Sequence, residues 1–342
     1  MAHVAPVYET RFASSGATVS VHSATAAEIS RGRIRAFWYG GSREGAKDVR
    51  IYSSVFDPDT LEWSPEAAVV TREQTEQDTM RSIRKLGNPV VSRDGDGRLW
   101  LFYVSVSVGG WSGSAVNVRV SEDEGRSWSR SKRLVTSPFL NLSTLVRGPA
   151  IRFRDGSQGL PVYHELFGKF GELLRVDARG RVLDKRRLTW GRSSLQPVIV
   201  PMSGEDAIGL LRSSGASPRR ILSVLTSDAG RHWTRMKATP LSNPDAGIAA
   251  IRSRAGELFV AFNDSETDRG NLTIAVSENG GDTWEIVHVL HPPEPTGDEK
   301  PRFAYPWFLQ TDNGMFHLFY TWNRRRIAHV RFNREWIRRQ QF

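Results

Sequence analysis

The chain has 342 residues, of which 39% are apolar, and its formal net charge is +10. Its size allows one large hydrophobic core or two ordinary ones, and the absence of cysteine excludes disulfides and thiolate metal sites. The sequence contains no run of about 18 or more apolar residues, the length that would indicate a transmembrane helix. The basic balance favours an anionic partner, but no zinc-finger, basic-zipper or RNA-recognition signature accompanies it, so we expect no nucleic-acid partner.

The N-terminal stretch "MAHVAPVYETRF" lacks the basic and then apolar pattern of a signal peptide. We therefore expect a cytoplasmic protein, or a periplasmic or secreted one if a leader has been removed. The sequence contains no metal-binding motif, and we expect no cofactor.

A glycine-containing turn followed by a strand of alternating large apolar residues recurs six times. The copies are "RGRIRAFWY", "DGRLWLFYV", "DGSQGLPVY", "GEDAIGLLR", "AGELFVAFN" and "NGMFHLFYT", about 50 to 65 residues apart. Another strand begins about nine residues before each turn, and several of these strands carry proline near the start, where the missing N–H costs least. Six such units predict one all-β domain over residues 1–342, a six-bladed β-propeller, with an array of β-sandwiches as the alternative.

Three polar loops, each closed by tryptophan, punctuate the same chain. They are "SEDEGRSW" from Ser121, "TSDAGRHW" from Thr226 and "SENGGDTW" from Ser277, and a degenerate fourth copy ends near Trp63. Their Asp or Asn, Gly and Ser or Thr residues are typical of turns, and the tryptophan is expected to pack between neighbouring blades. A binding site occurs once whereas these loops recur, so we predict that they stabilise blades on the face opposite the site.

The three loops resemble Asp-boxes, also called BNR repeats. Over nearly its full length the chain resembles the sialidase-like BNR-repeat superfamily, whose members are six-bladed propellers. The resemblance implies a sialidase-like exo-acting glycoside hydrolase. Its partner would be an acidic glycan or glycoconjugate, from which it removes a terminal sialic acid, Kdo or uronate.

Topology predicts a site from the residues alone. The start of each first strand and the end of each second strand lie on one face of a propeller, around its axis, where loops on a rigid scaffold commonly bind ligands. The first-strand starts are His22, Asn88, Arg147, Gln196, Asp245 and Tyr305, with Asn243 close by. The second-strand ends and their loops add Arg43, Glu44, Asp48, Tyr163, His164, Glu165, Arg212, Asn263, Asp264, Arg269, Trp322 and Arg325. Arginine binds carboxylates through paired hydrogen bonds, so this ring favours an acidic ligand.

Sialidases bind the sugar carboxylate with three arginines and use a tyrosine nucleophile with a glutamate partner. The resemblance implies that Arg212 and Arg269 are two of the arginines and that Tyr305 is the nucleophile. The chain departs from the pattern at the first arginine, where it has His22, and at the glutamate, which falls near Ser194. His22 or Arg43 would then supply the third cation.

The remaining roles stay open between several residues. A tyrosine with a pKa of about 10 needs a base, and Glu165, His164 and His22 are candidates. Glu44 and Asp48 compete to protonate the leaving oxygen. Sugar hydroxyls would bind Asn88, Gln196 and Asn243, and Arg325 is a further candidate cation. A non-catalytic carbohydrate-binding propeller and a uronate-directed polysaccharide lyase are the alternative functions.

Overall fold

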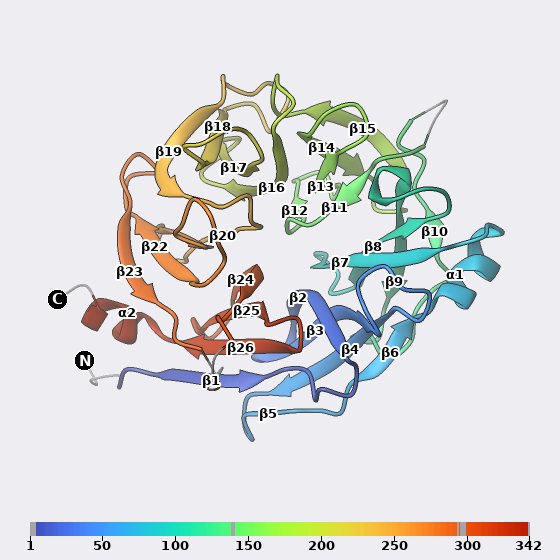
Figure 1. The fold of residues 1–342 in the computed structure, drawn as a ribbon, viewed down its shortest axis with the longest axis horizontal. Coiled ribbons are helices and arrows are strands. Elements are labelled where there is room, and N and C mark those ends of the chain that lie inside the picture. The colour runs from blue at the N-terminus through green and yellow to red at the C-terminus, as the bar shows by residue number, and fades with distance from the viewer. Residues whose placement is uncertain (1–4, 138–140, 293, 295–298, 341–342) are drawn as a thin grey trace.

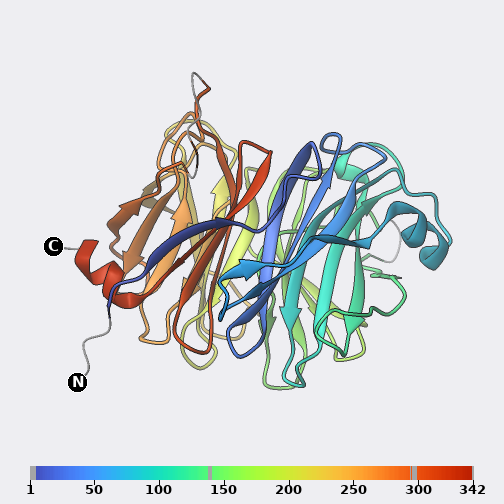
Figure 2. The same cartoon turned by 90° about the horizontal axis from the view of Figure 1, so that it is seen from below.

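Six antiparallel sheets surround a common axis, as Figure 1 shows in the view along that axis. The computed structural model describes residues 5–137, 141–292, 294 and 299–340. Figure 2 shows the sheets from the side, with loops at both ends of the ring. The fold is the predicted six-bladed β-propeller.

The blades follow one another along the chain, and the first strand of each lies nearest the axis (Figure 1). Blade 1 contains β2 (Ser20–Ser30), β3 (Arg33–Gly41), β4 (Arg50–Asp57), β5 (Glu62–Trp63) and β6 (Ala67–Val70). Blade 2 contains β7 (Lys85–Arg93), β8 (Leu99–Val106), β9 (Ser114–Ser121) and β10 (Lys132–Arg133). Blade 3 contains β11 (Leu145–Val146), β12 (Ile151–Arg152), β13 (Gln158–His164), β14 (Phe170–Val176) and β15 (Val182–Arg187).

The second half of the ring repeats this plan. Blade 4 contains β16 (Ser194–Pro201), β17 (Ala207–Ser213), β18 (Arg220–Thr226) and β19 (Lys237–Ser242). Blade 5 contains β20 (Ala249–Arg252), β21 (Leu258–Phe262), β22 (Thr273–Ser277) and β23 (Glu285–Val289). Blade 6 contains β24 (Phe303–Gln310), β25 (Phe316–Trp322) and β26 (Arg326–Phe332). Helix α1 (Arg72–Thr79), the short helix η1 (Trp111–Gly113) and helix α2 (Arg334–Gln340) lie outside the sheets.

Both ends of the chain build blade 6. Strand β1 (Tyr8–Phe12) pairs antiparallel with β26, so the N-terminal segment supplies the outer strand of the last blade. The side chain of Asn333 strengthens this closure by accepting a hydrogen bond from the Val7 N–H and donating one to the Ala5 carbonyl. The repeats indicated the number of blades, but not that the two ends share one.

The six predicted turns between the first and second strands are present, and glycine explains their geometry. Their glycines have φ between 57° and 100°, a left-handed region that residues with a Cβ rarely adopt; they are Gly32, Gly97, Gly156, Gly204, Gly256 and Gly314. In the middle of each sheet the strands are buried on both faces, and blade 2 illustrates this because every residue of β8 is buried.

The tryptophan loops follow the third strands, at the same end of the ring as these glycine turns. In the first loop the Asp123 carboxylate accepts hydrogen bonds from the N–H and hydroxyl of Ser127, while the Trp128 indole donates to the Gly125 carbonyl at 3.1 Å. The Trp128 ring packs edge-on against Phe37 of blade 1, with 5.7 Å between ring centroids. The loop therefore closes a turn and joins two blades.

Two residues that depart from the loop pattern, Asn279 and His232, still form the hydrogen bonds that close the turn. In the third loop the Asn279 side chain accepts from the Thr283 N–H and donates to the Thr283 hydroxyl, both at 2.9 Å. In the second loop His232 replaces the hydroxyl residue, and its N–H and ring Nδ1 both contact the Asp228 carboxylate. Each substitution leaves the turn bonded across the same four-residue interval.

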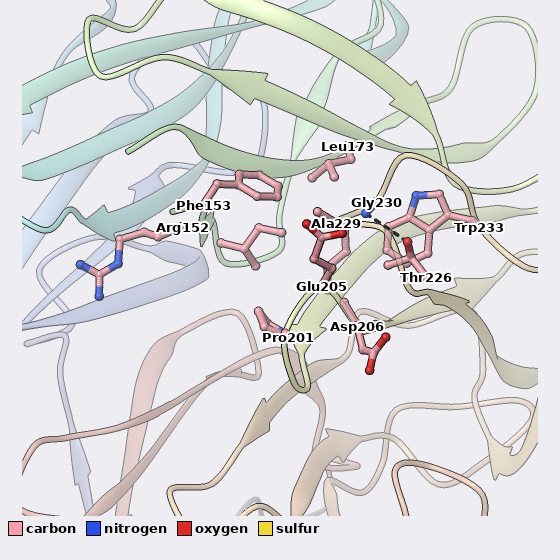
Figure 3. A pocket seen from close by; sticks show the side chains of 14 residues that line it. Arg152, Phe153, Leu173, Pro201, Glu205, Asp206, Thr226, Ala229, Gly230 and Trp233 are labelled. Atoms are coloured by element: carbon pink, nitrogen blue, oxygen red, sulfur yellow. Dashed lines mark hydrogen bonds between the residues drawn. The ribbon is translucent and has the colours of Figure 1, made fainter. Parts of the chain in front are cut away.

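A cavity of about 80 Å³ lies beside the second loop, between blades 3 and 4 (Figure 3). Trp233 and the hydrogen bond from the Gly230 N–H to Thr226 form one side of it, and Phe153 and Leu173 of blade 3 form the other. This cavity is small and lined largely by packing side chains, so it belongs to the joint between blades.

Candidate functional site

A repeated backbone feature builds the site at the opposite end of the ring. Near the start of five first strands, one residue other than glycine has a left-handed φ of 43° to 58°: Ser23, Asn88, Gln196, Asp245 and Tyr305. Register shifts in the pairing with the second strand span four of these five places. Such backbone strain costs about 1–3 kcal/mol per residue and concentrates at functional sites.

Two arginines are held around the carboxylate-bearing residue Asp245. The Arg212 Nε donates to the Asp245 carboxylate at 2.5 Å, and the Arg269 Nη2 donates to the Asp245 carbonyl at 2.8 Å. Arg212 also donates from Nη1 to the Gln196 side-chain oxygen at 2.8 Å. Burial disfavours the Arg212 cation, but Tyr305 and Asp245 outweigh this and raise its pKa. These contacts fix both guanidinium groups before any ligand binds.

Tyr305 is half-buried beside these arginines. Its hydroxyl lies 3.5 Å from the Gln196 Nε2, so the nearest hydrogen-bonding side chain is an amide. The Arg147 guanidinium lies over its ring, 5.2 Å from the centroid, and His22 contacts the ring edge-on with 4.6 Å between centroids. Tyr305 thus has a partly open face toward solvent and a buried polar layer beneath it.

Arg147 is the main residue of this buried layer, and its role was missed in the sequence. Only 2% of it is exposed, and its Nη2 donates to the Pro306 carbonyl at 2.8 Å. Burial lowers its pKa to about 10, so the guanidinium is still charged at neutral pH. Arg147 stands at the start of a first strand, as His22 and Tyr305 do in their own blades, and this position could have indicated its role.

Tyr163 connects the amides of two blades within the same layer. Its hydroxyl lies 3.2 Å from both the Asn88 Nδ2 and the Gln196 Nε2, which donate to it. Burial raises the pKa of Tyr163, so the phenol is neutral. Asn88 and Gln196 are themselves almost fully buried, at 8% and 3% exposure. They therefore position Tyr163, Arg212 and Tyr305 from below.

His22 is buried as a neutral imidazole. Burial, followed by the charges of Arg324 and Arg147, lowers its pKa well below the ordinary value. The third positive charge beside Tyr305 is accordingly that of Arg147 rather than of His22.

The candidate carboxylates differ in their surroundings. Burial raises the pKa of the Glu165 carboxyl, with Lys169 and Arg212 opposing the shift. The Glu44 carboxylate pairs with Arg324 at 3.1 Å. Asp48 is exposed and accepts from both the N–H and the hydroxyl of Ser42, which lowers its pKa. Glu165 therefore holds a proton more readily than an ordinary glutamate, whereas Asp48 closes its own loop.

The other candidates have separate surroundings. Asn243 is fully buried and accepts from the Ala246 N–H at 2.9 Å, so it shapes the loop that carries Asp245. Arg325 is 61% exposed and pairs with Glu299 at 3.1 Å. Arg43 is exposed on the loop that Asp48 closes. The His164 Nε2 accepts from the Phe167 N–H at 3.1 Å.

Within the described ranges, no group of three or more His, Asp or Glu side chains is arranged to hold a metal ion. In the same ranges, no helix is long and apolar enough to cross a membrane.

Comparison with known proteins agrees with this architecture. The crystal structure of a protein of unknown function from Dyadobacter fermentans superimposes with a TM-score of 0.77 at 14% identity, covering 95% of this chain and 98% of that one. An intramolecular trans-sialidase from Ruminococcus gnavus gives a TM-score of 0.73 at 12% identity, covering 96% and 97%. The NanB sialidase from Streptococcus pneumoniae gives 0.75 at 11% identity, covering 94% and 70%. These identities establish a shared fold only.

Among curated protein sequences, none matches the chain. The family model of the BNR repeat-like domain matches residues 32–318, which is most of the chain. Six blades, three tryptophan loops and this match lead to one conclusion: the chain belongs to the BNR repeat-like domain family, with a sialidase-like propeller fold.

Proposed function

We propose that the protein is an exo-acting glycosidase that removes a terminal acidic sugar from a glycan. The observation that carries this proposal is the convergence of three guanidinium groups on Tyr305. Arg147 lies over its ring, Arg212 donates to the Gln196 side chain that also reaches the Tyr305 hydroxyl, and Asp245 holds Arg269 beside Arg212. Such a cluster suits a ligand that brings a carboxylate to the reacting centre.

Arg212 and Arg269 would bind the sugar carboxylate. Both are partly exposed, and Asp245 orients them, so little side-chain freedom is lost on binding. Arg147 is too buried to reach solvent, and it would instead stabilise negative charge on the Tyr305 oxygen from beneath.

Tyr305 would attack the anomeric carbon or stabilise the oxocarbenium-like centre. A free tyrosine with a pKa of about 10 is a poor nucleophile, so Tyr305 needs a base to take its proton and a polar neighbour such as the Gln196 amide to hold its oxygen. Glu165 is our candidate to take its proton, because burial raises the pKa of that carboxyl. Glu44 is our candidate to protonate the leaving oxygen, in preference to Asp48, whose pKa is lowered.

A uronate lyase is the second candidate, and one observation favours it. The neighbour of the Tyr305 hydroxyl is an amide rather than a carboxylate. A lyase needs a tyrosine or histidine to remove the proton next to a carboxylate that an arginine neutralises, and it needs no pair of carboxylic acids. Tyr305 and Arg212, which are both partly exposed, meet that requirement, whereas His22 is buried.

A screen of 4-methylumbelliferyl glycosides of sialic acid, Kdo and glucuronic acid tests the hydrolase, with the neutral galactoside as control. We expect release of the fluorophore from one acidic glycoside and not from the galactoside. Incubation with polyuronates tests the lyase, because elimination leaves an unsaturated product that absorbs in the ultraviolet. Binding of an acidic glycan with no product from either assay would contradict both and indicate a binding propeller.

A further inference from the structure

A cationic pocket opens next to Arg269 on the site face. Its volume is about 340 Å³, at the lower end of the range of about 300–1,000 Å³ for small-molecule sites. It is lined by Pro244, Thr267, Asp268, Arg269, Gly270, Lys300, Pro301 and Arg302. Three of these side chains are cations and one is a carboxylate, so the lining carries a net positive charge.

The backbone around Arg302 is fixed on both sides. The Phe303 N–H donates to the Arg269 carbonyl at 2.9 Å, which ties the start of β24 to the loop between β21 and β22. The Arg302 N–H donates to the Asn323 side-chain oxygen at 2.7 Å, and the Asn323 N–H donates to the Arg302 carbonyl at 2.8 Å. Arg302 is thus held in a fixed position relative to Arg269.

The cations of this pocket are not neutralised by the carboxylates that the structure describes. The Asp268 carboxylate accepts from the Gly270 N–H at 2.8 Å and so serves its own turn. Glu299, the nearest described acid along the chain, pairs with Arg325. In the described parts of the chain, Lys300 and Arg302 form no ion pair within 4.0 Å, and both are exposed. Arg302 also acts on Arg269: burial, then Arg212 and Arg302, lower the pKa of Arg269.

We propose that this pocket is an anion subsite for a second negatively charged group of the substrate, carried by the sugar that is joined to the terminal acidic sugar. Arg269 belongs to both sites, so it would connect the carboxylate of the terminal sugar with the neighbouring anion. The inference rests on the proposed function, and it names the substrate class: a glycan with two adjacent anionic groups. The second group is a carboxylate, sulfate or phosphate, all of which guanidinium and ammonium groups bind.

The test compares substrates that carry one anionic group with substrates that carry two. If the screen identifies sialic acid, the reference is 3′-sialyllactose. The two dianionic probes are α2,8-linked disialic acid, for a carboxylate, and 3′-sialyllactose sulfated on galactose, for a sulfate. We expect kcat/KM for at least one dianionic probe to exceed the reference about five- to tenfold. The more reactive probe shows which anion the pocket binds.

The double variant Lys300→Ala/Arg302→Ala should remove this preference, lowering kcat/KM for the dianionic probe about five- to tenfold more than for the reference. Arg179→Ala/Arg181→Ala, at two exposed arginines of blade 3, controls for the loss of two positive charges. A wild-type protein with no preference, or a double variant that weakens both substrates equally, would overturn the inference while leaving hydrolysis intact.

Titration calorimetry with the same probes separates the two proposals if nothing is cleaved. Tighter binding of a dianionic probe to the wild type, lost in the double variant, would support the subsite although the hydrolase had failed. Equal affinity for all probes would overturn the subsite as well.

Discussion

The two ends of the propeller are both built by repetition, but different things repeat. At one end the tryptophan loops repeat side-chain chemistry: the Asp or Asn at the third position bonds the residue four places later in all three copies. At the other end, five first strands repeat a left-handed backbone residue, and the five side chains all differ. The tryptophan loops repeat the same side-chain contacts between blades, whereas the strand starts repeat a backbone geometry and carry a different side chain each time, as expected of the candidate site.

The contrast extends to energetics. The first tryptophan loop satisfies the polar groups of its turn and adds apolar contact with the preceding blade through Trp128 and Phe37, whereas in the second loop the Trp233 Nε1 has no hydrogen-bond partner among the described residues. The strand starts instead combine strained backbone with a buried cation, Arg147, whose Nε has no hydrogen-bond partner among the described residues. Proteins keep such costs where function requires them.

The largest expected effect is on kcat, from a substitution at the end of the propeller that carries the candidate site. Tyr305→Phe keeps the ring that packs on Arg147 and His22 but removes the hydroxyl. We expect kcat to fall about 100- to 10,000-fold with little change in the thermal midpoint. Steady-state kinetics and thermal unfolding of the same sample measure both, and a variant with wild-type turnover would exclude Tyr305 from the chemistry.

Arg212→Ala should reduce kcat/KM by about 2–4 kcal/mol, or about 30- to 1,000-fold, because it removes a carboxylate ligand and leaves Asp245 without its ion pair. Arg212→Lys keeps the charge but loses the planar fork, so it should recover only part of this loss. Kinetics of the two variants on one acidic substrate provide the measurement. If turnover by Arg212→Ala were unchanged, Arg212 would have no place in the carboxylate clamp.

The joint between blades 6 and 1 differs from the joints that the tryptophan loops form, because two histidines of blade 6 make its hydrogen bonds. The indole of Trp63 donates to the His329 Nδ1, and the His329 Nε2 lies 2.9 Å from the His317 Nδ1. Burial lowers the pKa of His317 to about 3 and that of His329 well below its ordinary value, whereas hydrogen bonds from Ser127 keep Asp123 ionised even in acid. Acid should therefore weaken this joint before the tryptophan loops.

Proton binding decides the direction in which the free energy of unfolding changes with pH. Both histidines take up protons more readily when unfolded, so their contribution to stability is complete above pH of about 6.5 and declines as the pH falls toward the folded pKa. We expect a loss of about 1.4 kcal/mol per pH unit for each histidine. Urea unfolding between pH 7 and pH 5 of wild type and of His317→Gln measures this, and the variant should show a shallower slope because it lacks one of the two buried histidines. A flat profile would contradict the buried neutral pair.

The smallest effect concerns the loops. Trp128→Ala should lower the free energy of unfolding by about 2 kcal/mol, since a half-buried ring is lost from the joint, and should leave kcat/KM of the folded fraction unchanged. Trp190→Ala, at a tryptophan that is 90% exposed, is the matched control and should cost much less. Loss of activity without loss of stability in Trp128→Ala would reverse the assignment of the two ends.

The sequence predicted the fold because its signals are local and periodic. Gly32 and its five counterparts stand where a turn needs a left-handed φ, and each tryptophan loop bonds within eight residues. The site depends on contacts across blades, and these were only partly visible. The contact between Arg147 and Tyr305 joins residues of blades 3 and 6, and the pairing of Glu44 with Arg324 joins blades 1 and 6. No local pattern predicts which of several polar residues will meet.

The same reason explains which roles could not be read from the sequence. Asp48 and Glu44 are acidic residues of the same loop, and the sequence alone does not distinguish their roles. In the structure the Ser42 N–H donates to the Asp48 carboxylate, whereas the Glu44 carboxylate forms an ion pair with Arg324. The charge state of His22 depends on its complete burial beside several arginines from other parts of the ring. The burial of a side chain and its distance to charges on other blades are fixed only when the blades pack together, so the sequence does not show them.

The most direct measurement is the release of 4-methylumbelliferone from the acidic glycosides by wild type, Tyr305→Phe and Trp128→Ala, each normalised to its folded fraction. The account predicts that wild type and Trp128→Ala cleave the same acidic glycoside at similar rates and that Tyr305→Phe does so at least about 100-fold more slowly. Equal rates for wild type and Tyr305→Phe would contradict the central claim that the left-handed strand starts form the catalytic site.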